Sequence, residues 1–210
     1  MKIALYGATG KSGSRILNEL VSRGHEVVAI ARDPAKVSAD RAGVSVRQDD
    51  LSDPAKIAAA VDGVDAVVSA YAPPHDDVDA LVGVTQRQVE ALARGKKPRL
   101  VVVGGAGGLN VAPGVSLIDS GYLPETVVPI AKAHVKALNV LRASDADWTY
   151  LAPAAFFEPG ERTGKFRLGS ADLIANEQHE SRISMEDYAI ALVDELENPR
   201  HRRQRFAVGY

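Results

Sequence analysis

Short runs of apolar residues recur along the chain and alternate with segments in which apolar residues return every three or four positions. Runs that are apolar at nearly every position are typical of parallel strands covered by helices on both faces. Runs of this kind occupy Ile3–Tyr6, Glu26–Ala31, Val44–Arg47, Ala66–Ala70, Leu100–Val103 and Trp148–Leu151. Because helical segments separate them, the pattern predicts an α/β protein built on a mostly parallel sheet.

The segments between these strands have the spacing of amphipathic helices. Ser14–Arg23 has apolar residues on one helical face and is followed by Gly24, a residue type that commonly ends helices. Asp53 before Pro54 predicts the start of a helix that runs to Val61, since Asp is a good N-cap and Pro is tolerated in the first turn. Longer helices are predicted from Asp76-Asp77 to about Arg94 and from Pro129 to Ala143.

The pattern changes after residue 152. An aromatic-containing loop is predicted from Pro153 to Gly169, with strand-like segments at Lys165–Leu168 and Ile174–Ile183. Ser184 predicts an N-cap for a helix through Leu196, and a last strand is predicted over residues 205–210. No repeat or linker divides the chain, so we expect one domain of residues 1–210, with a core of about residues 1–152 and a smaller lobe of residues 153–210 that includes the closing helix and strand.

Composition limits the classes of function. The 210 residues are 46% hydrophobic and 25% charged, which is typical of a globular protein. The net charge of −2 predicts no nucleic-acid or membrane partner and favours a small molecule, and the basic run at residues 200–205 is interpreted as a solvated turn. The chain has no cysteine, and its five histidines show no metal-ligand spacing, so we expect no metal site. The short apolar N-terminus predicts a cytoplasmic protein.

The strongest local signal is the glycine-rich segment between the first strand and the first helix. Gly7, Gly10 and Gly13 permit a tight turn that brings backbone N–H groups to a pyrophosphate at the helix N-terminus. A nucleotide triphosphatase loop is disfavoured because Lys11 and Ser12 precede the last glycine instead of following it. The segment therefore predicts a Rossmann-like dinucleotide site.

The end of the second predicted strand indicates which dinucleotide is bound. NAD enzymes usually place Asp or Glu there for the ribose hydroxyls, whereas this chain has Arg32, which would pair with a 2′-phosphate. Asp33 could hold the ribose itself, but we interpret it mainly as the cap before Pro34. We therefore predict NADP, with NADPH preferred over NADH. The acidic segment 49–51 could place a carboxylate and backbone amides beside the adenine, or could cap a helix.

Together these segments resemble the atypical short-chain dehydrogenase/reductases, in the NAD(P)H-binding group that includes NmrA-like proteins and biliverdin reductase B/flavin reductase. The resemblance covers essentially the whole chain. It rests on Gly7-Ala8-Thr9-Gly10-Lys11-Ser12-Gly13, Ala31-Arg32-Asp33-Pro34, Val103-Gly104-Gly105-Ala106-Gly107, Leu141-Arg142-Ala143-Ser144 with Asp147-Trp148-Thr149, and Arg182-Ile183-Ser184 before Asp187-Tyr188-Ala189. It implies a doubly wound sheet with a small substrate-side lobe at the C-terminus. The predicted cofactor-binding residues are Gly7, Thr9, Gly10, Lys11, Ser12, Gly13, Arg32, Asp50, Leu51, Ala70, Lys132 and Pro153.

The chain departs from this superfamily where ordinary members carry their catalytic residues. Those members have a Tyr four residues before a Lys as the general acid, with a Ser nearby. Lys132 fits the lysine position, but Val128 stands four residues earlier, and Gly104-Gly105-Ala106 follows the fifth strand where the serine would be. Loss of a positioned acid costs a carbonyl reduction roughly 10²–10⁴ in rate. A flavin or quinone, which delocalises the charge, is therefore the predicted hydride acceptor.

The acceptor pocket is predicted outside the strand ends, between residues 70–74, 104–119 and 153–157. Its predicted lining is Tyr71, Gly105, Tyr122, Phe156 and Phe157, although the two phenylalanines could equally belong to a local core. The catalytic residues are not identified; Tyr122 and Lys132 are weak candidates. Two alternatives remain open, a non-catalytic NADP(H) sensor that contacts a regulatory protein and an NADP-dependent epimerase or isomerase. A monomer and a homodimer are both compatible with the sequence.

Overall fold

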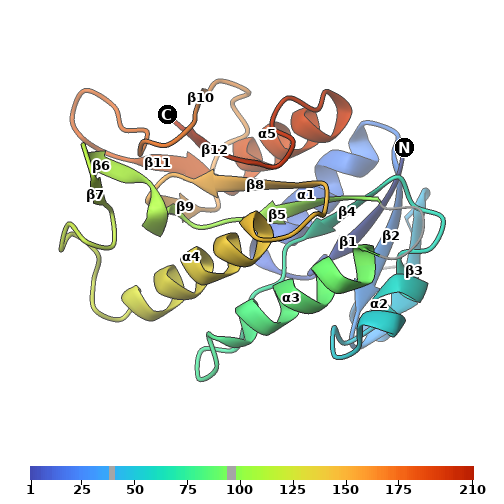
Figure 1. Cartoon of the computed structure of the whole chain (residues 1–210). Helices are drawn as coiled ribbons and strands as arrows, with labels where there is room; N and C mark the ends of the chain where they lie inside the picture. Colours follow the sequence, from blue (N-terminus) through green and yellow to red (C-terminus); the bar gives the residue numbers. More distant parts are fainter. Residues whose placement is uncertain (38–40, 94–97) are drawn as a thin grey trace.

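The computed structural model describes residues 1–37, 41–93 and 98–210 (Figure 1). The central feature of the described residues is an eight-stranded sheet in which neighbouring strands are parallel, except at the β10–β12 edge. Its strands, in spatial order, are β3 (Val44–Gln48), β2 (Glu26–Ala31), β1 (Lys2–Tyr6), β4 (Ala66–Ser69), β5 (Arg99–Val103), β8 (Trp148–Pro153), β12 (Gln204–Gly209) and β10 (Arg167–Gly169). The predicted fold class, a doubly wound α/β sheet, is confirmed.

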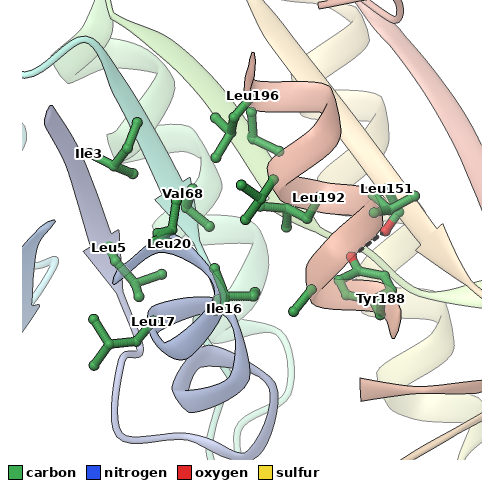
Figure 2. Close-up of a cluster of buried hydrophobic side chains, with 14 of the residues drawn as sticks. Ile3, Leu5, Ile16, Leu17, Leu20, Val68, Leu151, Tyr188, Leu192 and Leu196 are labelled. Carbon is green, nitrogen blue, oxygen red and sulfur yellow. Dashed lines mark hydrogen bonds between the residues drawn. The ribbon is translucent and has the colours of Figure 1, made fainter. Parts of the chain in front are cut away.

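Helices cover both faces of the sheet. Alternate residues of β1 point to opposite faces, so that Ile3 and Leu5 enter one core while Ala4 and Tyr6 enter the other. The first core lies beneath α1 (Lys11–Ser22) and α5 (Met185–Glu197), which pack against each other (Figure 2). The opposite face is covered by α2 (Pro54–Ala60), α3 (Ala80–Leu92) and α4 (Val128–Arg142).

Most helix starts predicted from capping residues are confirmed. Asp53 accepts a hydrogen bond from the Ala55 N–H at 2.7 Å and begins α2. Ser184 Oγ accepts the Asp187 N–H at 3.0 Å and begins α5. The helix predicted from Asp76-Asp77 begins later, at Ala80. Residues 77–80 form a turn instead, in which Asp77 accepts the Ala80 N–H. Its predicted end, Arg94, lies outside the described residues.

The predicted strand over Ile174–Ile183 is wrong for most of its length. The side chain of Asn176 accepts the backbone N–H groups of Gln178 and Glu180, and this local turn competes with extended pairing. Only the end of the segment is extended, in β11 (Arg182–Ser184), which pairs with β9 (Phe156–Glu158). The strand predicted over 165–168 forms two residues later, as β10.

The smaller elements lie at the ends of the sheet. They are the turn η1 (Pro34–Lys36), the turn η2 (Ala106–Gly108) and a hairpin of β6 (Asn110–Ala112) and β7 (Val115–Ser116). Within the predicted lobe of residues 153–210, α5 and β12 belong to the main core, while the loops around β9 to β11 lie at its margin. No helix of the described residues is long and apolar enough to cross a membrane.

Successive strands are added on one side of β1 and then on its other side, so the direction in which the sheet grows reverses at β1. Along the chain the sheet grows from β1 through β2 to β3 on one side, and then from β4 through β5 to β8 on the other. Such a point leaves a crevice between the loops at the carboxyl ends of β1 and β4, where ligands of doubly wound proteins bind. The functional residues are therefore expected at this edge.

Candidate functional site

The loop after β1 requires glycine at two positions for reasons of space. Gly7 has φ +78°, and a Cβ on it would lie 2.3 Å from the Ala70 carbonyl oxygen at the end of β4. A Cβ on Gly13 would lie 2.0 Å from the Gly7 carbonyl oxygen. Both distances are far below van der Waals contact, so the backbone turn between β1 and α1 can close only with these glycines.

The N-terminus of α1 is open for a ligand. Its N-cap is Gly10, and no side chain accepts a hydrogen bond at this cap. Thr9, Gly10 and Lys11 are exposed, and no acidic residue lies in the first turn. The first N–H groups of a helix have no partner within the helix and attract anions together with the helix dipole. The predicted pyrophosphate loop therefore has the required local geometry.

A cavity of about 240 Å³ extends from this loop across the ends of β2, β3 and β4. Arg32 and Lys36 line it, and both side chains are exposed. Asp33 accepts the Ala35 N–H at 3.2 Å and so acts as the cap of η1, as predicted. The remaining lining residues are Tyr6 to Gly10, Ile30, Ala31, Asp33, Asp49 to Leu51 and Ala70 to Ala72.

A buried carboxylate with one free oxygen forms the floor of this cavity. Asp49 is 6% exposed; its Oδ2 accepts a hydrogen bond from the Tyr6 hydroxyl at 2.9 Å, while its buried Oδ1 has no partner in the structure. Burial, together with the charge of Asp49, raises the pKa of Tyr6 well above its ordinary value, so Tyr6 remains a donor. Leaving a buried acceptor unpaired is costly, which indicates that Oδ1 awaits a donor from a ligand.

The neighbouring acidic residue is oriented differently. Asp50 is exposed, and it accepts hydrogen bonds from the Ser52 N–H at 3.0 Å and from the Ser52 hydroxyl, which lower its pKa. Leu51 has φ +62°, an unfavourable conformation for this residue type, and its carbonyl oxygen accepts a bond from Arg87 Nε at 2.6 Å. The strained turn places Asp49, Asp50 and Leu51 along the cavity.

The other side of the crevice lies beyond β4 and β5. Tyr71 follows β4, lines the cavity and packs against α3 and α4. Gly105 follows β5, and a Cβ on it would lie 2.9 Å from the His134 ring of α4. The hydroxyl of Tyr150, from β8, accepts the Gly105 N–H at 2.8 Å and lies 3.2 Å from His134 Nδ1. Neutral polar groups therefore gather where the superfamily resemblance places a serine.

Several predicted site residues lie apart from these groups. Lys132 is on the exposed face of α4, and Tyr122 is 79% exposed in the loop before that helix. Phe156 is 59% exposed beneath the guanidinium of Arg182, whereas Phe157 packs on Tyr188 with ring centroids 4.6 Å apart. Phe157 thus belongs to the core of the α1 and α5 face.

Sequence reasoning had missed several of the residues that line the crevice. Lys36 lies four residues after Arg32, and a second cation so close to the first could have been predicted from the sequence to line the same site. Tyr6 is buried at the end of β1, where the sequence shows only an apolar run, whereas Asp49 belongs to the acidic segment 49–51 that the sequence had indicated. No local signal marks the bond between the Gly105 N–H and the Tyr150 hydroxyl, since only the strand order brings β8 beside β5.

Comparison with known proteins agrees with this geometry. A family model described as NAD(P)H-binding matches residues 7–199. The chain belongs to this NAD(P)H-binding family. The match extends from the glycine loop to the end of α5, so the family includes both sides of the crevice.

Solved structures of several bacterial proteins are similar over the whole chain. A Burkholderia pseudomallei protein, described as a candidate exported protein, is 47% identical with a TM-score of 0.90 and full coverage of both chains. A candidate epimerase from Bacteroides thetaiotaomicron is 40% identical with a TM-score of 0.92, covering 100% of this chain and 96% of its own. A candidate NADH-flavin reductase from Streptococcus pneumoniae is 35% identical with a TM-score of 0.89, covering 100% of this chain and 99% of its own.

The residues of the crevice fit an NAD(P)H molecule. The glycine turn leads into the uncapped start of α1, whose first N–H groups suit a pyrophosphate, and Asp49 offers an unpaired acceptor at one end. From β2 to β5 the sheet takes three strand steps, about 14 Å at the usual spacing, so an extended dinucleotide can reach from Arg32 toward Gly105. NAD(P)H supplies a hydride when bound, and the chain supplies its binding and orientation.

Proposed function

We propose that the protein is an NADPH-dependent reductase that transfers hydride to a flavin, a quinone or a similar conjugated small molecule. The observation that carries the proposal is the combination of a dinucleotide crevice with the absence of a tyrosine four residues before Lys132. Val128 begins α4 where the acid would precede Lys132, and Gly104-Gly105 follows β5. An acceptor that delocalises charge needs no such acid.

The preference for NADPH rests on the charge of the cavity. Arg32 and Lys36 are the cations at its rim, and Asp33 is engaged as the cap of η1. Guanidinium groups bind phosphates strongly, and a free acidic residue would be needed for the ribose hydroxyls of NADH. The similar Streptococcus protein is described as an NADH-flavin reductase, so the cofactor is a point on which this chain is proposed to differ.

The other parts of the proposal concern orientation. The open end of α1 would hold the pyrophosphate, and Ala70, Tyr71 and Gly105 would flank the reacting rings. Catalysis would then consist of holding two flat rings in contact and excluding water, which alone lowers a bimolecular barrier substantially. We also propose that the protein acts in the cytoplasm, without a nucleic-acid or membrane partner.

The test is the oxidation of NADPH by the purified protein, followed at the nicotinamide absorbance with FMN, riboflavin, menadione or a simple aldehyde as acceptor. We expect saturable turnover with the conjugated acceptors and none with the aldehyde, and a higher kcat/KM with NADPH than with NADH. Turnover restricted to the aldehyde would contradict the proposal. Tight cofactor binding without any turnover would instead support a sensor, and interconversion of a sugar epimer with bound NADP⁺ would support an epimerase.

A further inference from the structure

His134 lies beside the crevice, at the end of β5, in a position that the binding of the cofactor does not explain. It lies on α4 and packs its ring against Gly105, where even a methyl side chain would come within 2.9 Å. The residue as a whole is partly exposed, although most of its ring is enclosed. Within the described residues its Nε2 makes no hydrogen bond, yet it is not one of the polar atoms sealed from solvent without a partner. Nε2 is therefore an unpaired polar atom that keeps some exposure.

A hydrogen-bond chain favours Nε2 as the ring nitrogen that carries the proton. The Gly105 N–H donates to the Tyr150 hydroxyl at 2.8 Å. That hydroxyl must direct its own proton elsewhere, and its nearest acceptor is His134 Nδ1 at 3.2 Å, followed by the His134 carbonyl oxygen at 3.4 Å. When Nδ1 accepts, the neutral imidazole carries its proton on Nε2. Burial raises the pKa of Tyr150, so the hydroxyl keeps its proton.

The charge of His134 follows from its surroundings. Burial lowers the pKa of His134 to about 4, so the imidazole is neutral at physiological pH. A neutral imidazole is a poor proton source but a good fixed donor of a hydrogen bond to a developing anion. The crevice of this protein thus contains a donor in place of the missing tyrosine acid.

We propose that His134 is a catalytic residue of the reductase, in which its Nε2–H hydrogen-bonds the oxygen or nitrogen of the acceptor on which negative charge develops. The inference rests on the proposed reductase function. When bound, NADPH would supply a hydride that forms a C–H, N–H or O–H bond on the acceptor, and this transfer would leave NADP⁺ and an anionic acceptor. The His134 Nε2–H stabilises this anion, and solvent water then supplies the single proton that neutralises it. Tyr150 acts as a positioning residue that sets the tautomer.

The position of His134 fits this role. Gly105 follows β5, next to β4 and Tyr71 in the sheet order, at the side of the crevice away from Arg32. The absence of a side chain at Gly105 lets the ring approach the strand ends. Lys132, two residues earlier, lies on the exposed face of the same helix. The rotation of α4 thus brings a histidine to the crevice instead of the lysine.

The first test measures the tautomer directly. Long-range ¹H–¹⁵N spectra of the protein with ¹⁵N-labelled histidine, assigned with His134→Gln, should show an unprotonated Nδ1 and a protonated Nε2 from pH 8 to pH 5. Tyr150→Phe should convert this single tautomer into a mixture. Addition of menadione to the NADP⁺-bound protein should shift the Nε2 resonance. A protonated Nδ1, or an Nε2 resonance that does not respond to menadione, would overturn the inference.

The second test separates chemistry from binding. His134→Phe should lower kcat for menadione by about 10²-fold, the usual effect of removing one donor to a developing anion, with an unchanged Kd for NADPH. His134→Gln, which keeps an N–H donor, should recover part of the rate. The matched control is His179→Gln, an exposed histidine on a remote turn. Wild-type kcat in His134→Phe would overturn this inference alone, whereas no turnover in the wild-type protein would overturn the reductase function as well.

Discussion

At the scale of single residues, the cofactor preference depends on the charges at the rim of the cavity. Arg32 is expected to bind the 2′-phosphate by charge-assisted hydrogen bonds. Replacement of Arg32 by Ala should weaken NADPH binding about tenfold, the equivalent of about 1.4 kcal/mol, and leave NADH binding nearly unchanged. Fluorescence titration with both cofactors measures the two affinities in one preparation. Equal losses for NADPH and NADH would refute the assignment.

Asp49 and Asp50 differ in burial, and this difference predicts which of them recognises the purine. The free Oδ1 of Asp49 can accept the exocyclic amine of adenine. The wild-type protein should therefore bind NADPH more tightly than its hypoxanthine analogue by about 1–3 kcal/mol, because the analogue presents an oxygen to the carboxylate. Asp49→Asn should remove most of this preference. If Asp50→Asn removes it instead, Asp50 is the adenine contact.

The choice between adjacent residues could not be read from the sequence. Asp49 and Asp50 have the same chemistry, and which side chain enters the cavity depends on the strained turn at Leu51. The same holds for Lys132 and His134, which lie two positions apart on α4 and so face different surroundings. The acidic pair was predictable and Lys132 was the residue predicted on α4, but the direction of each side chain was not predictable.

At the scale of elements, the turn between β1 and α1 depends on the contact of Gly13 with the Gly7 carbonyl oxygen. A Cβ at Gly13 would lie 2.0 Å from that oxygen, so Gly13→Ala must displace the backbone of the pyrophosphate loop. We expect an affinity for NADPH lowered by more than about 100-fold, or over 2.7 kcal/mol, measured by calorimetric titration.

Gly83→Ala in α3 is the matched control for this substitution. A Cβ there would lie 3.2 Å from Arg87 Nη1, at the end of a side chain that can yield slightly while its Nε keeps the bond to the Leu51 carbonyl oxygen. Because Ala favours the helix, this variant should keep the wild-type affinity and gain about 0.5–1 kcal/mol of stability. An unaltered affinity in Gly13→Ala would show that the loop does not bind the pyrophosphate.

The elements that were predicted correctly have strong local determinants. β2 forms over the predicted residues, and α5 begins at the capping serine. The segment over Ile174–Ile183 was predicted wrongly because its apolar residues suggested a strand, while the Asn176 side chain formed a turn. Local polar groups thus competed with the pattern of apolar positions.

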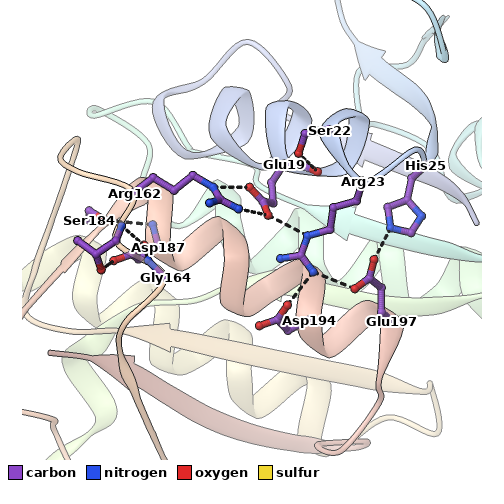
Figure 3. Close-up of polar contacts among 11 residues, drawn as sticks. Glu19, Ser22, Arg23, His25, Arg162, Gly164, Ser184, Asp187, Asp194 and Glu197 are labelled. Carbon is purple, nitrogen blue, oxygen red and sulfur yellow. Dashed lines mark hydrogen bonds and ion pairs between the residues drawn. The ribbon is translucent and has the colours of Figure 1, made fainter.

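At the scale of the whole molecule, an ion-pair network joins α1, α5 and the loop before β10 (Figure 3). Glu19 of α1 accepts hydrogen bonds from Arg23 Nε at 2.8 Å and from Arg162 Nη2 at 2.9 Å. Arg23 also contacts Asp194 and Glu197 of α5. The network connects the helix of the pyrophosphate loop with the C-terminal segment, so its loss should affect stability more than the chemistry of the site.

The titration of Glu19 predicts how stability depends on pH. Burial alone would raise the pKa of Glu19, but the hydrogen bonds and charges of Arg162 and Arg23 outweigh it and hold the pKa below its ordinary value of 4.5. A lowered pKa means that the stabilisation is complete above pH 4.5 and is lost as the pH falls further. Glu19→Gln should lower the free energy of unfolding by about 1–2 kcal/mol at pH 7, because Arg162 is exposed and Arg23 keeps its pairs with Asp194 and Glu197.

Urea unfolding at pH 7 and pH 3.5 tests this prediction. The variant should differ from the wild type more at pH 7 than at pH 3.5, because below pH 4.5 the unfolded chain binds a proton at Glu19 while the native ion pairs resist it. The NADPH affinity of the folded variant should stay within a few-fold of wild type. The same difference in stability at both pH values would show that the carboxylate charge of Glu19 is not responsible.

The sheet, the glycine turn and the cation after β2 could all be inferred from residues adjacent in the chain, because hydrophobic periodicity and turn chemistry act over a few positions. The pairs Tyr6–Asp49 and Gly105–Tyr150 join residues 43 and 45 positions apart, and the exposure of Lys132 depends on the rotation of α4. These features arise from strand order and helix packing, which bring together residues that no local pattern connects. The chain alone therefore specified a dinucleotide fold, while the packed molecule determined which polar groups face the crevice.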